Sequence, residues 1–104
     1  MEEKIRGLKE FAAAKGIRFV VVAMPEHAQV YAGFKSPIVD RPQNDLAAYA
    51  KKNGIELLNL LPLLRPEAKQ QLFYDNCHYT PHGNEVVARL ILDFLRRTGD
   101  VASK

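Results

Sequence analysis

A chain of 104 residues, with 47% hydrophobic and 26% charged residues, has the length and composition of one modest globular domain. This composition excludes disordered and collagen-like classes. The 15 basic residues are interspersed with 12 acidic ones, leaving a formal net charge of +3, so we expect a solvated surface and no nucleic-acid partner. No apolar run approaches the roughly 18 residues of a membrane span, and residues 1–4 do not resemble a signal peptide. The single cysteine permits no internal disulfide and indicates no cellular compartment.

The first half of the chain predicts a helix, a strand and a long loop. Residues 2–15 form the helix, which stops at Gly16 and carries apolar residues at helical spacing, namely Ile5, Leu8, Phe11 and Ala12. Residues 17–23 are almost entirely β-branched or aromatic, which is typical of a strand buried on both faces of a parallel sheet. Pro25 ends this strand. Residues 26–42 are expected to form a long loop, with or without one short turn of helix.

The second half repeats the same order. Residues 45–52 predict a helix that is closed by Gly54, and residues 55–60 predict a second strand. A short helical stretch, broken by two prolines, is expected within residues 61–72. The last helix is expected to run from about Pro81 to Thr98.

Thr80 and Pro81 have the character of an N-cap followed by proline at the first helical position, and Gly99 ends the last helix. The order of elements predicts an α/β protein with a right-handed βαβ unit. Because two strands make a poor sheet alone, we expect the chain to be part of a larger domain or to assemble with copies of itself. Edge-to-edge pairing is the form that such self-assembly would take.

A polar loop ahead of the last helix carries the most suggestive chemistry in the chain. Asp75 and His78 are spaced so that the carboxylate can accept the Nδ1 proton of the imidazole. This contact would fix the ring tautomer and leave Nε2 free to take a proton from a nucleophile. The chain contains only two serines, Ser36 and Ser103, and neither lies in a recognisable nucleophile turn.

Asp75, His78, Pro81 and Gly83 match the Asp-x-x-His block that precedes the terminal helix in the SGNH, or GDSL-like, hydrolase superfamily. The chain therefore resembles the C-terminal half of that superfamily domain, and it looks closest to the branch related to alginate O-acetylation. The strand that ends at Pro25, with a tyrosine six residues later, resembles a central strand of the same branch.

The resemblance implies a three-layer α/β/α, flavodoxin-like parallel sheet that is incomplete here, with about two strands and three to four helices. It implies one partial domain over residues 1–104, with His78 as general base and Asp75 as its orienting partner. The complete protein would act on an acyl ester or an acetylated carbohydrate, without a cofactor or metal.

The departures from the superfamily concern the nucleophile. The Gly-Asp-Ser block has no counterpart in this chain, nor do the later glycine and asparagine that supply oxyanion-hole donors. Because the members of a triad act together, we expect the isolated chain to be inactive.

The alternative is a noncatalytic α/β module that uses its sheet edge and helix faces for self-association or partner binding. A receiver-like domain is disfavoured, because no acidic pair or phosphate loop follows the first strand.

Other candidate residues have simpler interpretations. Cys77 adjoins His78 and is expected to be a partly buried, inert thiol. His82 lies four residues after His78, but Pro81 places the helix start between them, so a metal site of both histidines with Asp75 is disfavoured. His27 is expected to be an ordinary loop residue. The tyrosines that flank the Asp-x-x-His loop, Tyr74 and Tyr79, are expected to pack against the last helix rather than to bind sugar.

Overall fold

The computed structural model describes residues 2–31 and 37–99. Their elements follow in the order α1 (Glu2–Ala14), β1 (Val20–Ala23), α2 (His27–Val30), α3 (Pro37–Lys52), β2 (Glu56–Asn59), α4 (Leu61–Leu64), the 3-10 turn η1 (Arg65–Glu67) and α5 (Pro81–Arg97). Strands β1 and β2 form a parallel pair, in which Val20 lies opposite Glu56 and Ala23 lies opposite Asn59. The predicted α/β class is therefore confirmed, with three long helices and two single helical turns in the described residues.

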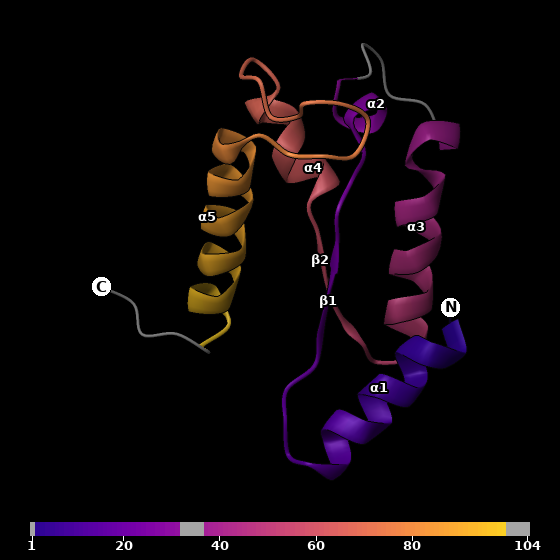
Figure 1. Cartoon of the computed structure of the whole chain (residues 1–104). Helices are drawn as coiled ribbons and strands as arrows, with labels where there is room; N and C mark the ends of the chain where they lie inside the picture. Colours follow the sequence, from indigo (N-terminus) through magenta and orange to yellow (C-terminus); the bar gives the residue numbers. More distant parts are fainter. Residues whose placement is uncertain (1, 32–36, 100–104) are drawn as a thin grey trace.

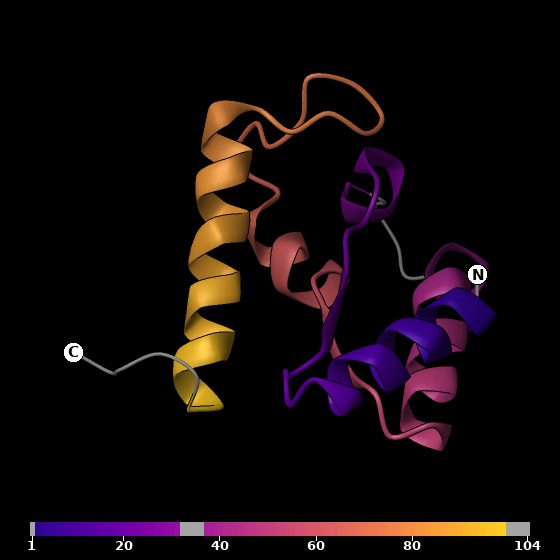
Figure 2. The ribbon, with the colours of Figure 1, turned by 60° about the horizontal axis from the view of Figure 1, so that its bottom comes forward.

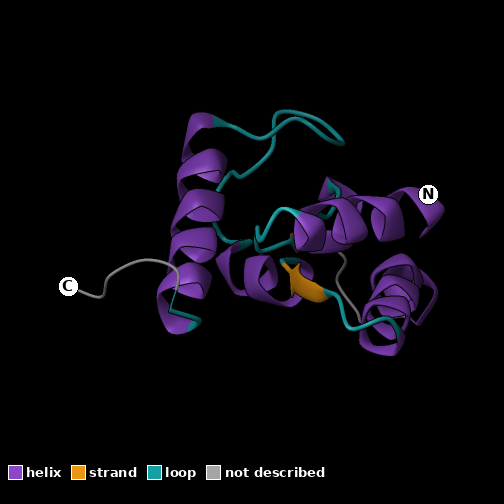
Figure 3. Cartoon of the chain, turned by 90° about the horizontal axis from the view of Figure 1, so that it is seen from below, coloured by secondary structure: helices purple, strands orange, loops and turns teal. Residues whose placement is uncertain are grey.

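Helices lie on both sides of the two strands (Figure 1). Helix α5 covers one side, whereas α3 lies on the other side and contacts β2. Figures 2 and 3 show the same separation from two further directions, with α1 on the side of α3. This arrangement corresponds to an incomplete three-layer α/β/α sandwich. None of the helices in residues 2–31 and 37–99 has the length and apolar run that crossing a bilayer requires.

Glycine ends the helix before each strand, as predicted. Gly16 and Gly54 adopt positive φ angles of 68° and 63°, a region that glycine enters without steric cost. In both cases the next residue turns back onto the helix: the Ile17 N–H donates to Ala12 O and the Ile55 N–H donates to Ala50 O, each at 2.8 Å. The chain thus enters β1 and β2 through the same helix-end geometry.

Helix α3 begins earlier than the predicted residue 45, and part of the expected loop is helical. Pro37 occupies the first helical position, where its missing N–H costs little. Pro42 lies inside the helix and removes one backbone donor. The early turns are held instead by side chains, because Asp40 pairs with Arg65 and Gln43 is buried. The remainder of the expected loop contains α2, and residues 32–36 lie outside the described part.

The first strand is shorter and more exposed than predicted. Its pairing with β2 begins at Val20 rather than at Ile17, whose side chain is 59% exposed. Within the described residues β1 pairs only with β2, so its other edge is unpaired and only Ala23 of this strand is buried. The described residues therefore leave apolar side chains of this segment partly exposed.

A leucine-rich core lies between the strand ends and α5. Its fully buried members are Leu60, Leu61, Leu64 and Leu72. Val86 and Val87 of α5 pack against them, together with Phe73 from the loop that precedes α5. This core fixes the start of α5, and with it the loop that carries Asp75 and His78.

Candidate active site

The loop between η1 and α5 is folded by its own backbone. The Tyr74 N–H donates to His78 O at 2.8 Å, and Phe73 and Tyr79 form an isolated antiparallel bridge. Inside this closed turn, Oδ1 of Asp75 accepts the backbone N–H groups of Cys77 at 3.0 Å and His78 at 2.9 Å. An aspartate that accepts from the residues two and three positions later is typical of an Asx turn. Asp75 is therefore held at the centre of the loop.

The side chains of Asp75 and His78 meet as predicted from their spacing. Nδ1 of His78 lies 2.9 Å from both carboxylate oxygens of Asp75. The carboxylate only accepts, so Nδ1 carries the proton in this contact and Nε2 is left as the basic nitrogen of the neutral ring. The backbone donors of Cys77 and His78, with the imidazole, lower the pKa of Asp75 to about 2, so this carboxylate is ionised at neutral pH.

Both members of the pair are open to solvent. The side chains of Asp75 and His78 are 59% and 73% exposed. The imidazole is thus oriented by one neighbour and is accessible to another molecule or chain segment. An oriented, accessible imidazole can take or give a proton at Nε2.

Two contacts fasten the loop to the carboxyl end of β1. The backbone N–H of His27, the first residue of α2, donates to Asn76 O at 2.9 Å. The Tyr79 hydroxyl donates to Pro25 O at 2.7 Å, and burial raises the pKa of this phenol to about 12. Figure 1 shows the loop lying next to α2, above the strand ends. Open α/β sheets bind their ligands at this end of the strands.

An aromatic cluster supports the loop from below. The rings of His27 and Tyr31 stack with their centroids 4.5 Å apart, and the ring of Phe73 meets His27 edge-on at 5.6 Å. The ring of Tyr79 packs on that of Phe73, with the two centroids 4.3 Å apart. The Tyr31 hydroxyl also accepts the N–H of Leu72 at 3.1 Å. His27 therefore has a packing role that sequence reasoning missed, although its i,i+4 spacing to Tyr31, the C-cap residue of α2, was the available signal.

The start of α5 follows the prediction. Thr80 is the N-cap, and its hydroxyl oxygen accepts the N–H of Gly83 at 2.9 Å. Pro81 is the first helical residue. The Thr80 N–H donates to Leu72 O at 2.9 Å, which ties the cap to the core.

Two of the predictions about flanking residues are wrong. Cys77 is exposed rather than partly buried, because the turn around Asp75 places it at the tip of the loop. Tyr74 is 68% exposed, so most of its surface is not covered by α5. Tyr79, by contrast, packs against the core that α5 shares.

The remaining candidates are not brought to the Asp75–His78 pair. His82 lies in the first turn of α5, with its ring bonded to Gln70 and Nδ1 4.0 Å from Glu85. It does not belong to the cluster of potential metal-ligand side chains around Asp75, which consists of Asp75, Cys77 and His78. Ser36 and Ser103 both lie outside the described residues.

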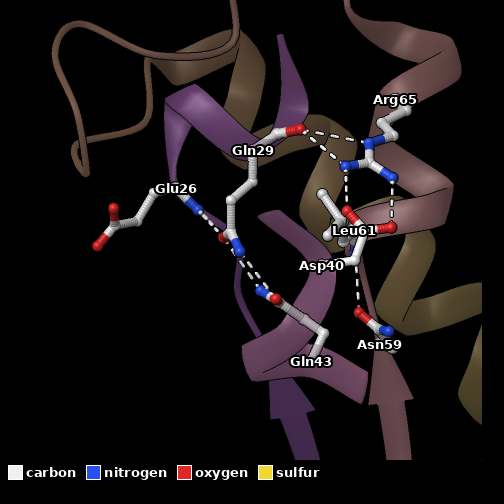
Figure 4. Close-up of polar contacts among 7 residues, drawn as sticks. All are labelled: Glu26, Gln29, Asp40, Gln43, Asn59, Leu61 and Arg65. Atoms are coloured by element: carbon white, nitrogen blue, oxygen red, sulfur yellow. Dashed lines mark hydrogen bonds and ion pairs between the residues drawn. The ribbon is translucent and has the colours of Figure 1, made fainter. Parts of the chain in front are cut away.

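A second polar cluster, which sequence reasoning missed, joins α2, α3 and η1 (Figure 4). The guanidinium of Arg65 donates to both carboxylate oxygens of Asp40, at 2.6 and 3.1 Å, and to Gln29 O at 3.1 and 3.2 Å. Gln29 and Gln43 exchange two amide hydrogen bonds of 2.8 and 3.0 Å. This cluster borders an open pocket of about 510 Å³. Because Arg65 is largely satisfied by protein acceptors, the cluster supports the arrangement of the three helices rather than an anion site.

The layered α/β fold, with an Asp–His pair on the loop before its last helix, defines a protein of the SGNH hydrolase-like class. More specifically, the chain belongs to the family described as "SGNH hydrolase-like domain, acetyltransferase AlgX", whose model matches residues 1–104. The predicted resemblance to the alginate-acetylation branch is thereby confirmed.

A solved structure shares this fold. The O-acetyltransferase domain of Pseudomonas putida AlgJ matches with a TM-score of 0.76 at 23% sequence identity, covering 99% of this chain and 41% of that chain. This chain thus spans less than half of the AlgJ structure. No curated protein matches the chain in sequence.

Proposed function

We propose that this chain supplies the general-base part of an SGNH-type acyl-ester hydrolase or carbohydrate O-acetyltransferase domain. The proposal is carried by the Asp75–His78 pair, in which both carboxylate oxygens lie 2.9 Å from Nδ1. His78 is the general base, and Asp75 holds its tautomer and stabilises the imidazolium that forms during reaction. The nucleophile is a serine from further polypeptide of the same domain, since neither Ser36 nor Ser103 lies in a recognisable nucleophile turn.

The reaction proceeds by two acyl transfers. Nε2 of His78 takes the proton of the serine hydroxyl while the serine oxygen attacks the ester carbonyl carbon, and a tetrahedral oxyanion forms. As this species collapses, the carbon–oxygen bond to the leaving alcohol breaks and Nε2–H returns the proton to that oxygen. Water or a sugar hydroxyl then attacks the acyl-serine, again with His78 as base. Free acid or a new ester is released, and the serine regains its proton.

The proposed substrate class is supported by the relatives and by the exposure of the pair. The similar domain of AlgJ is an O-acetyltransferase, so the acyl group proposed here is acetyl and the alcohol is a carbohydrate hydroxyl. With His78 73% exposed in this chain, a bulky saccharide can reach Nε2. The chemistry requires no cofactor or metal.

Exposed apolar side chains support a larger assembly around this segment. Phe11, Ile17 and Leu8 are 62%, 59% and 57% exposed, all on or next to α1. The outer edge of β1 is also unpaired within the described residues. Burying such groups stabilises a protein by roughly 1.5–3 kcal/mol for each large side chain. We propose that further polypeptide of the same domain covers them, with self-association through this surface as the alternative, noncatalytic role.

The test is turnover of p-nitrophenyl acetate. The isolated chain and its His78→Ala variant are expected to be equally inactive. In a protein that joins this segment to a Gly-Asp-Ser block, His78→Ala is expected to lower kcat by at least ~10²-fold, and Asp75→Asn by about 10²- to 10⁴-fold. His82→Ala is the matched control, since it removes another exposed histidine four residues away.

Two outcomes would contradict the proposal. His78-dependent turnover by the isolated chain would place the nucleophile within these 104 residues. Equal activity of the parent and the His78→Ala variant in the joined protein would remove His78 from catalysis. In that case a concentration-dependent dimer of the isolated chain, measured by light scattering, would support the noncatalytic role.

A further inference from the structure

Cys77 places a thiol beside the Asp75–His78 pair. Its Sγ lies 3.6 Å from Nδ1 of His78, on the same nitrogen that contacts both oxygens of Asp75. One ligand atom from each of the three side chains lies within 4.8 Å of the other two, and all three residues are exposed. The mechanism proposed above makes no use of this thiol.

We infer that Asp75, Cys77 and His78 form a binding site for a soft divalent metal ion, with Zn²⁺ as the expected ligand. Thiolate, imidazole and carboxylate are the donors that zinc takes in proteins. Zinc–ligand bonds of about 2.0–2.3 Å in a tetrahedron separate neighbouring donor atoms by about 3.3–3.8 Å. The observed separation of 3.6 Å between Sγ and Nδ1 falls within this range. The separation of 2.9 Å between Nδ1 and the Asp75 oxygens is that of a hydrogen bond, so it has to widen by about 0.4 Å when the metal replaces the shared proton.

The loop arranges these donors before any metal arrives. Oδ1 of Asp75 accepts the N–H groups of both Cys77 and His78, which holds the two donor residues on one turn. The outer contact between Tyr74 N and His78 O closes the same turn at 2.8 Å. Little further ordering of the backbone is needed to bring the three side chains around one ion. The exposed side leaves room for water as a fourth ligand.

Metal binding would oppose the base function, and this consequence rests on the function proposed above. A metal on Nδ1 takes the position of the proton shared with Asp75, so the proton of the neutral ring moves to Nε2. Nε2 then has no free electron pair with which to accept a proton from serine. Binding also releases the thiol proton of Cys77, so the apparent affinity rises with pH. The loop would therefore be a site at which zinc reversibly blocks the acetyl-transfer chemistry.

The test is a titration of the chain with CoCl₂, a spectroscopic probe for zinc sites, followed by displacement with ZnCl₂. We expect one ion per chain and a near-ultraviolet thiolate-to-cobalt charge-transfer band that zinc removes. Cys77→Ser is expected to abolish the band, and His78→Ala to weaken binding by at least about 10-fold. His82→Ala, the matched control, should bind like the parent.

The outcomes separate this inference from the proposed function. The metal site would be overturned, without bearing on catalysis, if no charge-transfer band formed at millimolar cobalt. It would also be overturned if the His78→Ala variant bound cobalt with the same affinity as the parent. Equal affinity in guanidinium chloride would likewise overturn it, since the folded loop would then be unnecessary. Conversely, equal activity of the joined protein and its His78→Ala variant would overturn the proposed function and would leave cobalt binding to this chain unaffected.

Discussion

Gly83 in the first turn of α5 lies directly against the backbone of Leu72. A Cβ added to Gly83 would overlap Leu72 O and would stand 2.9 Å from the carbonyl carbon. That carbonyl oxygen already accepts the Thr80 N–H at 2.9 Å. The first turn of α5 is therefore pressed onto a buried segment with no space for a side chain. This close approach gives a physical reason for glycine at this position, a few residues after the Asp75–His78 pair.

Gly83→Ala is expected to lower the free energy of unfolding by about 1–3 kcal/mol, because the new methyl group meets backbone atoms that cannot rotate away. Urea denaturation followed by circular dichroism measures the change. The control is Gly7→Ala in α1, where a Cβ meets nothing within 4 Å. There alanine should stabilise the helix by up to about 1 kcal/mol. Equal stability of the Gly83→Ala variant and the parent would contradict the close contact.

Thr80→Ala is expected to destabilise the chain by about 1–2 kcal/mol, since it removes the N-cap of α5. The Thr80 hydroxyl accepts the Gly83 N–H and donates to Gln71 O at 2.8 Å, so both contacts disappear. Thr80→Ser keeps the hydroxyl and should recover most of the loss. Thr98→Ala at the exposed end of α5 should stay within about 0.5 kcal/mol of the parent in the same urea titration. A full loss in the serine variant would assign the effect to packing instead.

Local signals in the sequence were sufficient for much of this structure. The cap at Thr80, the helix ends at Gly16 and Gly54, and the contact of Asp75 with His78 each depend on residues within a few positions of one another. Such features are encoded by side chains that bond to their own backbone neighbourhood. The α/β class and the position of the candidate base could therefore be predicted.

Features that depend on distant contacts could not be predicted. Helix α3 begins at Pro37 rather than near residue 45, and its early turns are held by pairing of Asp40 with Arg65, 25 positions away. The support of the loop by Tyr31, whose hydroxyl bonds to Leu72 41 positions later, has the same origin. The exposure of Cys77 follows from how the turn is oriented on the core, which no pattern in the sequence reports. The proposed serine nucleophile is a further case, because residues 2–31 and 37–99 contain no serine.

The ion pair of Arg65 with Asp40 is expected to show a coupling energy of about 1–3 kcal/mol in a double-mutant cycle. The two side chains are only 18% and 24% exposed and share two hydrogen bonds, so solvent weakens the pair little. Arg65→Met, Asp40→Asn and the double variant are compared by urea denaturation. The control cycle uses Arg41 and Asp45, which are 76% and 73% exposed at 3.7 Å. That cycle should give about 0–0.5 kcal/mol. Equal coupling in both cycles would contradict the shielding of the inner pair.

Asp75→Asn is expected to change the tautomer of His78. In the parent the carboxylate requires the proton on Nδ1, whereas the amide of asparagine can donate to Nδ1 and favour the proton on Nε2. Long-range ¹H–¹⁵N correlation spectra of the neutral ring distinguish the two forms directly. The spectrum of His82 should not change, because its ring contacts Gln70 and Glu85 instead. An unchanged His78 spectrum would mean that Asp75 does not orient the ring in solution.

Acid is expected to remove a stabilising contribution of Asp75 as the pH falls from about 4 to about 2. Its pKa is about 2 in the folded chain against an ordinary value of 3.8, so the ionised form favours folding above this range and the advantage is lost below it. A carboxyl ¹³C titration measures the pKa. In His78→Ala it should rise only part of the way to 3.8, because the N–H groups of residues 77 and 78 are the leading causes of the shift. Complete recovery of the ordinary value would show that the imidazole alone, and not the turn, holds the carboxylate ionised.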